Sequence, residues 1–194
     1  MRRGSATSIV LVIVIIASLA FYAGFRLGQT QTQQITVQAP QQPIPQGGCI
    51  KLEIINDRDY YPKLLDLLSK ANKSIYISMF EFKSDTDEVA KVLELLISKA
   101  KKGVDVKVVL ENTIDENELT YRRLLDNGVP VRYDTRSRTT HTKLIIIDGY
   151  IVIVGSHNWS YSAFMRNHEA SVVIYDENIA RQETNYFMQI YSGN

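Results

Sequence analysis

The chain has 194 residues, and its hydrophobic fraction of 45% is enough for one globular domain of ordinary size plus an appendage. The formal net charge is +1, and without the three arginines of the first 26 residues the rest carries 19 basic and 21 acidic residues, which excludes a polycationic nucleic-acid binder and leaves only a local basic patch. The single cysteine, Cys49, excludes an internal disulfide and argues against a cysteine-based zinc site.

The first element in chain order is an apolar segment. Residues 4–25 contain no charged side chain, and as a helix they would span roughly 33 Å, enough to cross the hydrocarbon core of a bilayer. Two arginines precede the segment and one follows it, a slight bias that favours a cytoplasmic N-terminus. We expect residues 1–25 to be an uncleaved signal anchor or, alternatively, a signal peptide cleaved after Ser18-Leu19-Ala20. The first reading gives a membrane-anchored extracytoplasmic domain, and the second gives a secreted or periplasmic one.

The next segment, residues 26–48, is rich in Gln, Thr and Pro and shows no apolar periodicity, which predicts a disordered linker. From Cys49 onward the apolar pattern alternates between the two periodicities of strands and helices. Strands are expected at 50–55, 74–82, 104–110, 129–133 and 169–175. Helices are expected at 60–71, from a cap at Ser84 or Asp85 to about 102, at 115–127, as a short helix or loop near 159–166, and at about 176–191.

This alternation predicts an α/β fold for residues 49–194, in which a mixed β-sheet is sandwiched by helices. The antiparallel part is the stretch HTKLIIIDGYIVIVGSHN, residues 141–158. Asp148-Gly149 between its two apolar runs is typical of a two-residue type I′ turn, which would pair Lys143 with Val154 and His141 with Ser156.

In that register one end of the hairpin collects polar side chains on a single face. Because side chains alternate along a strand, His141, Lys143, Ser156 and Asn158 would point to one side and His157 to the other. Asp148 would lie at the far end, where a role in the turn explains it better than chemistry.

The residue types in this cluster suit a phosphate. A lysine ammonium and an asparagine amide can bind phosphoryl oxygens, and histidine serves as a nucleophile or proton donor near neutral pH. The spacing of carboxylates or histidines needed for a metal site is absent, so we expect no metal and no cofactor, with the lysine supplying the positive charge. Four such groups on one face are difficult to explain as ordinary surface residues.

These residues carry a resemblance to a known family. His141-x-Lys143-x4-Asp148, followed by Gly155-Ser156-x-Asn158, resembles the HKD motif of the phospholipase D superfamily, and Glu169 matches the acidic position of its small nuclease branch. The resemblance implies a phospholipase D-like fold and metal-independent phosphodiester cleavage through a covalent phosphohistidine. The implied roles are a nucleophile for His141, phosphoryl binding for Lys143 and Asn158, support of the site for Ser156, orientation of an imidazole in its own or a neighbouring chain for Glu169, and structural roles for Asp148, Gly149 and Gly155.

The number of motifs bears on the oligomeric state. The implied mechanism needs two histidines, but the chain has one motif, and His168 lacks a lysine partner. The small members of the family are homodimers whose two motifs meet at a two-fold axis. We therefore expect a homodimer that shares one active site.

Features near the motif bear on the substrate. Arg132, Arg136 and Arg138 form a local basic run that could hold flanking phosphates, or else a solvated loop. Trp159 could stack on a base, although core packing is the alternative. The leading hypothesis is an endonuclease for DNA or RNA that favours single strands. The alternatives are a phospholipase such as a cardiolipin hydrolase, suggested by the membrane helix, and a phosphate-binding module without turnover.

Overall fold

The computed structural model describes residues 49–135 and 137–193. The expected signal anchor at 1–25, the expected linker at 26–48 and Arg136 therefore lie outside the described residues. From Gly48 onward the chain forms one compact unit. Within the described ranges, no helix combines the length and the apolar character needed to cross a membrane.

The compact unit is built on a seven-stranded mixed sheet with the strand order β1-β7-β6-β5-β2-β3-β4. Parallel pairing joins β2 to β3 and β3 to β4, whereas all the other neighbours are antiparallel. The strands are β1 (Lys51–Asn56), β2 (Ser74–Met79), β3 (Asp105–Leu110), β4 (Val131–Tyr133), β5 (Lys143–Ile147), β6 (Ile151–Gly155) and β7 (Ala170–Tyr175).

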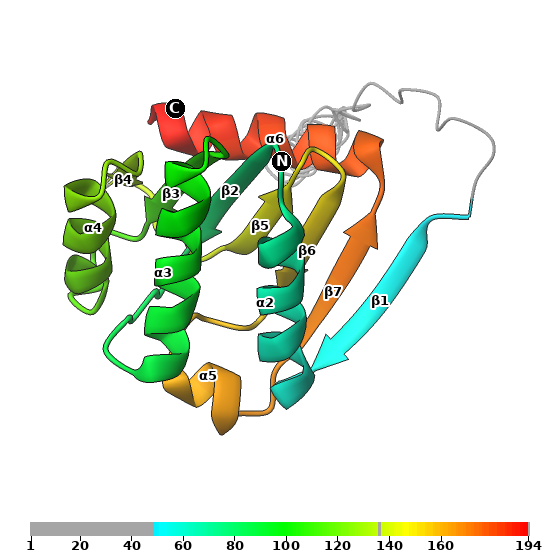
Figure 1. Ribbon diagram of the computed structural model, residues 1–194, viewed down its shortest axis with the longest axis horizontal. Coiled ribbons are helices and arrows are strands. Elements are labelled where there is room, and N and C mark those ends of the chain that lie inside the picture. Colours follow the sequence, from blue (N-terminus) through cyan, green and yellow to red (C-terminus); the bar gives the residue numbers. More distant parts are fainter. Residues whose placement is uncertain (1–48, 136, 194) are drawn as a thin grey trace, which may run out of the picture. The chain divides into compact units, whose positions relative to one another are not determined.

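Helices cover both faces of the central strands (Figure 1). On one face lie α2 (Tyr60–Lys70) and α3 (Asp87–Lys101), and on the other lies α6 (Glu177–Ser192). The remaining helical segments are η1 (Asp57–Asp59), α4 (Asn117–Asp126) and α5 (Tyr161–Met165). The predicted α/β fold with a mixed sheet between helices is confirmed for the compact unit.

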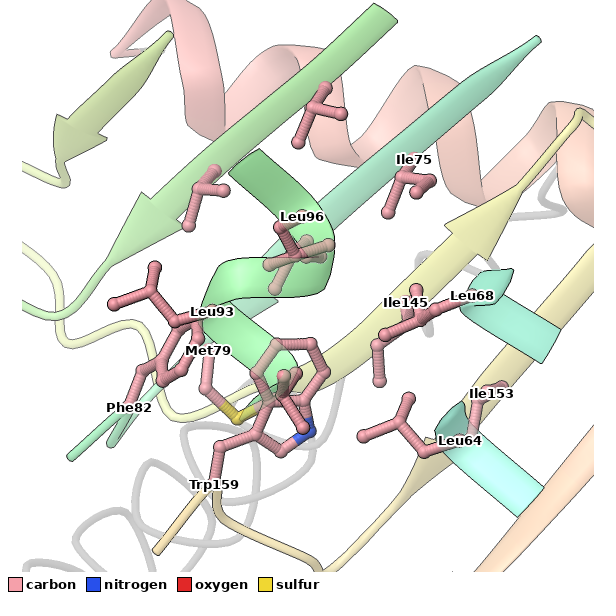
Figure 2. Close-up of a cluster of buried hydrophobic side chains, with 14 of the residues drawn as sticks. Leu64, Leu68, Ile75, Met79, Phe82, Leu93, Leu96, Ile145, Ile153 and Trp159 are labelled. Carbon is pink, nitrogen blue, oxygen red and sulfur yellow. The ribbon is translucent and has the colours of Figure 1, made fainter. Parts of the chain in front are cut away.

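The larger hydrophobic core lies between the sheet and helices α2 and α3. Figure 2 shows Leu64 and Leu68 of α2 beside Ile153 of β6 and Ile145 of β5, and Leu93 of α3 near Met79 of β2. A smaller core lies between the sheet and α6. It contains Leu144 and other strand residues whose side chains point to the opposite face of the sheet. Every residue of β5 is buried, as expected for a strand that is covered on both faces.

The expected helix start at Ser84 or Asp85 is corrected by the structure. Helix α3 begins at Asp87, with Thr86 as its N-cap. Ser84 is buried, and its hydroxyl accepts a hydrogen bond of 2.8 Å from the Thr120 hydroxyl of α4. Ser84 therefore satisfies a polar group inside the protein rather than a helix end.

The expected hairpin register is wrong by one residue. Leu144, rather than Lys143, pairs with Val154, and Ile147 pairs with Ile151, so the loop contains three residues, Asp148 to Tyr150. Asp148 and Gly149 both have positive φ, at 56° and 65°, as a tight turn of this hand requires.

The turn owes its position to contacts beyond the hairpin. The Asp148 carboxylate accepts hydrogen bonds from the backbone N–H groups of Asn72, Lys73 and Ser74, at 2.7 to 3.1 Å. Burial would raise the pKa of Asp148, but these three donors outweigh it and hold the pKa below its ordinary value. The turn is thus fixed against the start of β2.

The strand directions gather many loops at one edge of the sheet. The carboxyl ends of β1, β2, β3, β4 and β6 and the amino ends of β5 and β7 meet there, as the pairing directions require. Residues that follow β2 or precede β5 can therefore become neighbours, although they are far apart in the sequence.

Candidate active site at one edge of the sheet

A pocket of about 340 Å³ lies at this edge, and its lining is His141, Lys143, Gly155, Ser156 and Asn158. The structure thus brings together the four polar side chains that the hairpin pattern selected, despite the shifted register. The reason is that β6 ends at Gly155, so residues 156–158 leave the ladder and strand parity no longer dictates their direction. The lining can offer a nucleophilic imidazole, an ammonium, a hydroxyl and an amide to one ligand.

Lys143 is the buried cation of the pocket, with an exposed fraction of 8%. Its Nζ atom lies 3.4 Å from each ring nitrogen of His141 and donates to the His141 carbonyl oxygen at 3.1 Å. Burial lowers the pKa of Lys143, and the negative charges of Glu169 and Glu81 offset this effect only in part. An ammonium held in this way is suited to a phosphate, which would supply the missing negative charge.

Two residues near the cation escaped the sequence analysis, Phe80 and Glu81. The Phe80 ring lies 4.4 Å from the His141 ring between centroids, and Lys143 Nζ lies 4.8 Å from the centroid of Phe80. Burial raises the pKa of Glu81. The one available signal was the acidic Glu81 at the end of an apolar stretch.

The backbone just before His141 is held by two carboxylates. The Thr140 N–H donates to Glu111 Oε2 at 2.6 Å and to Asp134 Oδ2 at 3.0 Å. Glu111 is almost completely buried. Burial would raise its pKa, but hydrogen bonds from Thr113 and Thr140 outweigh it and keep the pKa below the ordinary value. Two carboxylates therefore fix the loop that presents the exposed His141 imidazole.

Ser156 lines the pocket and is hydrogen-bonded to Glu169, which lies behind it. The Ser156 hydroxyl donates to Glu169 Oε2 and accepts from the Ala170 N–H at 3.1 Å. The Asn167 amide donates to Glu169 Oε1 at 3.0 Å. In the part of the chain that the structure describes, no hydrogen bond joins Glu169 to His141, so the carboxylate does not orient the imidazole of its own chain directly.

Gly155 is required by a close approach of two strands. A Cβ atom at this position would lie 2.1 Å from Ser171 Oγ and 2.4 Å from the Ala170 carbonyl oxygen. Only glycine lets β6 lie this close to β7 at the pocket.

The two other histidines lie outside the pocket. His157 is completely buried, stacks on Tyr60 at 4.0 Å between centroids, and lies 2.8 Å from Ser171 Oγ through Nδ1. Burial lowers the pKa of His157. The expectation that His157 points away is confirmed, although the register used to reach it was wrong. The exposed His168 lies beside Asp57, with 3.3 Å between Nδ1 and Oδ2.

The basic and aromatic residues assigned to substrate binding separate in the structure. Trp159 is completely buried and donates from Nε1 to the Tyr60 hydroxyl at 2.9 Å, so core packing is confirmed and its assignment to substrate binding is wrong. Arg132 lies over the Tyr191 ring at 4.9 Å and donates to the Tyr191 carbonyl oxygen, away from the pocket. Arg138 lines a second pocket that also contains His141.

Asn158 is oriented by its place in the loop after β6. Its side chain lines the pocket, and its Oδ1 atom is buried without a hydrogen-bond partner in the described structure. Among residues 49–135 and 137–193, no group of three or more His, Cys, Asp and Glu side chains lies close enough to hold a metal ion. The positive charge that these residues place inside the pocket is that of Lys143.

The chain is similar to known proteins in sequence and in fold. The family model described as "Cardiolipin synthase, PLD-like domain" matches residues 64–191. Mitochondrial cardiolipin hydrolase of Xenopus tropicalis is 30% identical over 132 residues, which cover 68% of this chain and 60% of that protein. Cardiolipin synthase of Staphylococcus aureus strain Mu50 is 34% identical over 125 residues, covering 61% of this chain and 24% of that protein. The chain thus spans only part of the length of these curated relatives.

A solved structure supports the same fold. Nuc from Salmonella typhimurium, a phospholipase D family member, superposes with a TM-score of 0.65 at 23% identity, covering 74% of this chain and 96% of that chain. At this identity the likeness establishes the fold alone.

Proposed function

Because the chain belongs to the PLD-like domain family of the phospholipase D superfamily, whose members cleave phosphodiesters, we propose that it is a nuclease that hydrolyses single-stranded nucleic acid through a phosphohistidine. The observation that carries this proposal is the pairing of an exposed imidazole, His141, with a buried ammonium, Lys143, in one pocket. A phosphate-binding module without turnover would not need an exposed nucleophile beside its cation.

The chemistry proceeds in two steps. In the first, a ring nitrogen of His141 attacks phosphorus, the bond to the leaving oxygen breaks, and a second imidazole protonates that oxygen. In the second, water attacks the phosphohistidine, gives a proton to the second imidazole and releases His141. Lys143 and Asn158 stabilise the negative charge on the phosphoryl oxygens in both steps.

The second imidazole comes from another chain in this proposal. His157 is buried and His168 is paired with Asp57, so neither lies in the pocket. A homodimer with one shared active site supplies the acid as the partner's His141. Glu169, which is held by Ser156 rather than by its own His141, then orients the imidazole of the other chain.

An uncovered apolar surface supports this assembly. Helix α6 packs on β2, β3, β5 and β6 and leaves β1 exposed, so Leu52 and Ile54 are 58% and 68% exposed. Ile54, Val172 and Val154 form one row across β1, β7 and β6, and Ser156 lies two residues beyond Val154. A second copy that covers this row, named here the β1 face, would lie directly beside the reaction pocket.

Cardiolipin hydrolysis is the second candidate, because a cardiolipin synthase family model and a cardiolipin hydrolase match the chain. Residues 1–25 would then hold the domain at its lipid substrate.

We also propose that residues 1–25 place the domain outside the cytoplasm. A reporter enzyme fused after the last residue would test this orientation, and reporter activity confined to the cytoplasm would contradict it.

The discriminating experiment incubates the purified full chain with labelled single-stranded DNA, duplex DNA, RNA and cardiolipin vesicles in excess EDTA. The proposal expects cleavage of single strands at an undiminished rate. Cleavage of cardiolipin alone would replace the proposal with the second candidate. Loss of all activity in EDTA, with recovery in magnesium, would contradict the role given to Lys143.

A further inference from the structure

A second and larger pocket adjoins the reaction pocket. It has a volume of about 580 Å³, which is within the range of small-ligand sites, and it lies between residues 134–135 and 137–142 on one side and the carboxyl-terminal part of α6 on the other. His141 lines both pockets. A substrate whose phosphorus reaches His141 can therefore continue into this second pocket, named here the α6 groove.

We propose that the α6 groove binds the part of a single nucleic-acid strand that flanks the scissile phosphate, with Arg138 on a neighbouring phosphate and Tyr186 stacked on an unpaired base. This inference rests on the proposed nuclease function and extends it from the reaction centre to the flanking nucleotides. It separates the roles of the basic run, because Arg132 is bound to Tyr191 outside the groove.

The guanidinium of Arg138 is available to bind a phosphate. It is exposed, and its guanidinium has no hydrogen-bond or ion-pair partner in the described structure. The acidic neighbour in the lining, Asp134, is already occupied, because its carboxylate accepts hydrogen bonds from Asn112 and Thr140. An unpaired guanidinium beside a satisfied carboxylate is available for a phosphate.

Tyr186 offers a free aromatic face. It lines the groove with 45% of its surface exposed, and no other aromatic ring stacks on it among the described residues. The neighbouring aromatic residue on α6, Phe187, is fully buried and stacks on Tyr76. Base stacking on an exposed ring needs an unpaired base, so this residue favours a single strand over a duplex.

The loop side of the groove suits a sugar–phosphate backbone better than an acyl chain. Hydrocarbon is stabilised by burial against apolar side chains, but the loop side of the groove presents mainly hydroxyl groups. The hydroxyl residues are Thr135, Ser137, Thr139, Thr140 and Thr142. Such groups donate hydrogen bonds to phosphate and sugar oxygens, which account for most contacts to a nucleic-acid backbone.

The groove wall is also held in place. Thr140 is fixed by Glu111 and Asp134, and the neighbouring Thr142 hydroxyl lies 2.6 Å from the Ser78 hydroxyl of β2. A flanking nucleotide would therefore be positioned relative to His141 by a loop that is fixed at its base. This is the arrangement that turns binding of remote nucleotides into orientation of the reacting phosphate.

The test compares two substrates of different length. Bis(p-nitrophenyl) phosphate occupies the reaction pocket alone, whereas a single-stranded oligonucleotide also enters the groove. For Arg138→Ala and Tyr186→Leu, the ratio of kcat/KM for the oligonucleotide to kcat/KM for the small diester should fall roughly 5- to 100-fold. Arg181→Ala, on the same helix, and Tyr150→Leu, which is equally exposed at the hairpin turn, lie outside the lining and should leave the ratio unchanged.

A binding measurement separates this inference from the proposed catalysis. Each groove substitution is combined with His141→Ala, and fluorescence anisotropy reports the affinity for the labelled oligonucleotide. Both substitutions should weaken binding, and Arg138→Ala should reduce the slope of log affinity against log salt by roughly 0.7. If the wild type cleaves neither substrate but these losses occur, the proposed catalysis fails and the groove stands.

The groove proposal would be overturned by oligonucleotide affinities equal to those of the His141→Ala parent. It would also be overturned by equal losses of kcat/KM on both substrates, which would place the two residues in the reaction pocket. If the two groove variants bound cardiolipin vesicles more weakly than the His141→Ala parent but bound the oligonucleotide equally well, the groove would be assigned to a lipid headgroup.

Discussion

His141 and Lys143 divide their tasks by burial. The exposed imidazole can reach a substrate, and it contributes little to the core. The ammonium is withdrawn beneath it and is held by the His141 carbonyl oxygen and the Phe80 ring. Because the lysine is buried, a phosphate in the pocket would meet a cation with little competing water, which would strengthen the attraction.

We expect His141→Ala to lower kcat by several orders of magnitude, on the order of 10⁶ for a lost nucleophile, with little change in the melting temperature. His157→Ala should instead lower the melting temperature and leave kcat nearly unchanged, because the residue is buried against Tyr60 and Ser171. It should reduce the free energy of unfolding by about 2–4 kcal/mol while the folded fraction stays active. Thermal melts and single-turnover assays measure both; equal catalytic losses would reject the assignment of roles.

The lowered pKa of Lys143 predicts a pH dependence. If the protonated form binds phosphate, loss of the ammonium should add its own decline in kcat/KM, here called the lysine limb, at a pH below 10.5, the ordinary value for lysine, beyond the decline caused by deprotonation of the imidazole acid. Bound phosphate stabilises the protonated form of Lys143. The lysine limb in the pH profile of kcat should therefore lie at a higher pH than in the profile of kcat/KM. Lys143→Arg should remove the lysine limb, because arginine stays protonated. A lysine limb that is unchanged in this variant would contradict the prediction.

At the scale of elements, the loop before β5 depends on two carboxylates, the buried Glu111 after β3 and the partly exposed Asp134 after β4. Glu111 binds the Thr140 N–H and both donors of Thr113, so it joins the end of β3 to the loop that carries His141. This arrangement lets a rigid sheet control the position of the loop that presents His141.

Glu111→Ala should lower kcat more than it raises KM for the small diester, and should reduce the free energy of unfolding by about 1–3 kcal/mol, because Thr140 and Thr113 lose acceptors. Glu111→Gln keeps an acceptor and should recover part of kcat. The folded-state pKa of Glu111 is lowered, so its stabilisation is present above 4.5 and is lost as the pH falls through the folded value. Urea titrations at several pH values should show a weaker acid dependence in Glu111→Gln; identical dependence would reject this role.

At the scale of the whole molecule, the proposed homodimer makes one chain half of a catalytic unit. The described structure places one histidine in the pocket, and the β1 face lies uncovered beside it. If two copies meet across this face, the same contact would bury the exposed apolar row and bring the second imidazole to the pocket.

Ile54→Lys should therefore yield a folded monomer with little activity, because the side chain is exposed in one chain and buried at the proposed interface. Leu125→Lys, at a similarly exposed apolar residue of α4, should remain an active dimer. Sedimentation velocity gives the oligomeric state. Mixing the wild type with excess His141→Ala should also reduce activity per wild-type chain, and a fully active monomer would exclude the shared site.

The sequence by itself determined the parts that depend on neighbours along the chain. The alternation of apolar periods predicted nearly every element, and the hairpin, which joins residues fewer than 20 positions apart, brought His141 and Lys143 close to Ser156 and Asn158. The clustering survived a one-residue register error because residues 156–158 have left the strand. Resemblance to one family motif added the expected roles of these residues.

Only the tertiary structure decided which residues surround that cluster. Phe80 and Glu111 reach it because β2 lies beside β5 and β3 beside β2, and an alternating pattern does not encode this strand order. The same non-local packing buries Trp159 and draws Arg132 onto α6. It also sets the hairpin register, because the Asp148 carboxylate is bound by the backbone that precedes β2. Periodicity reports which face of an element is apolar, whereas the partner of that face is selected by packing between distant segments.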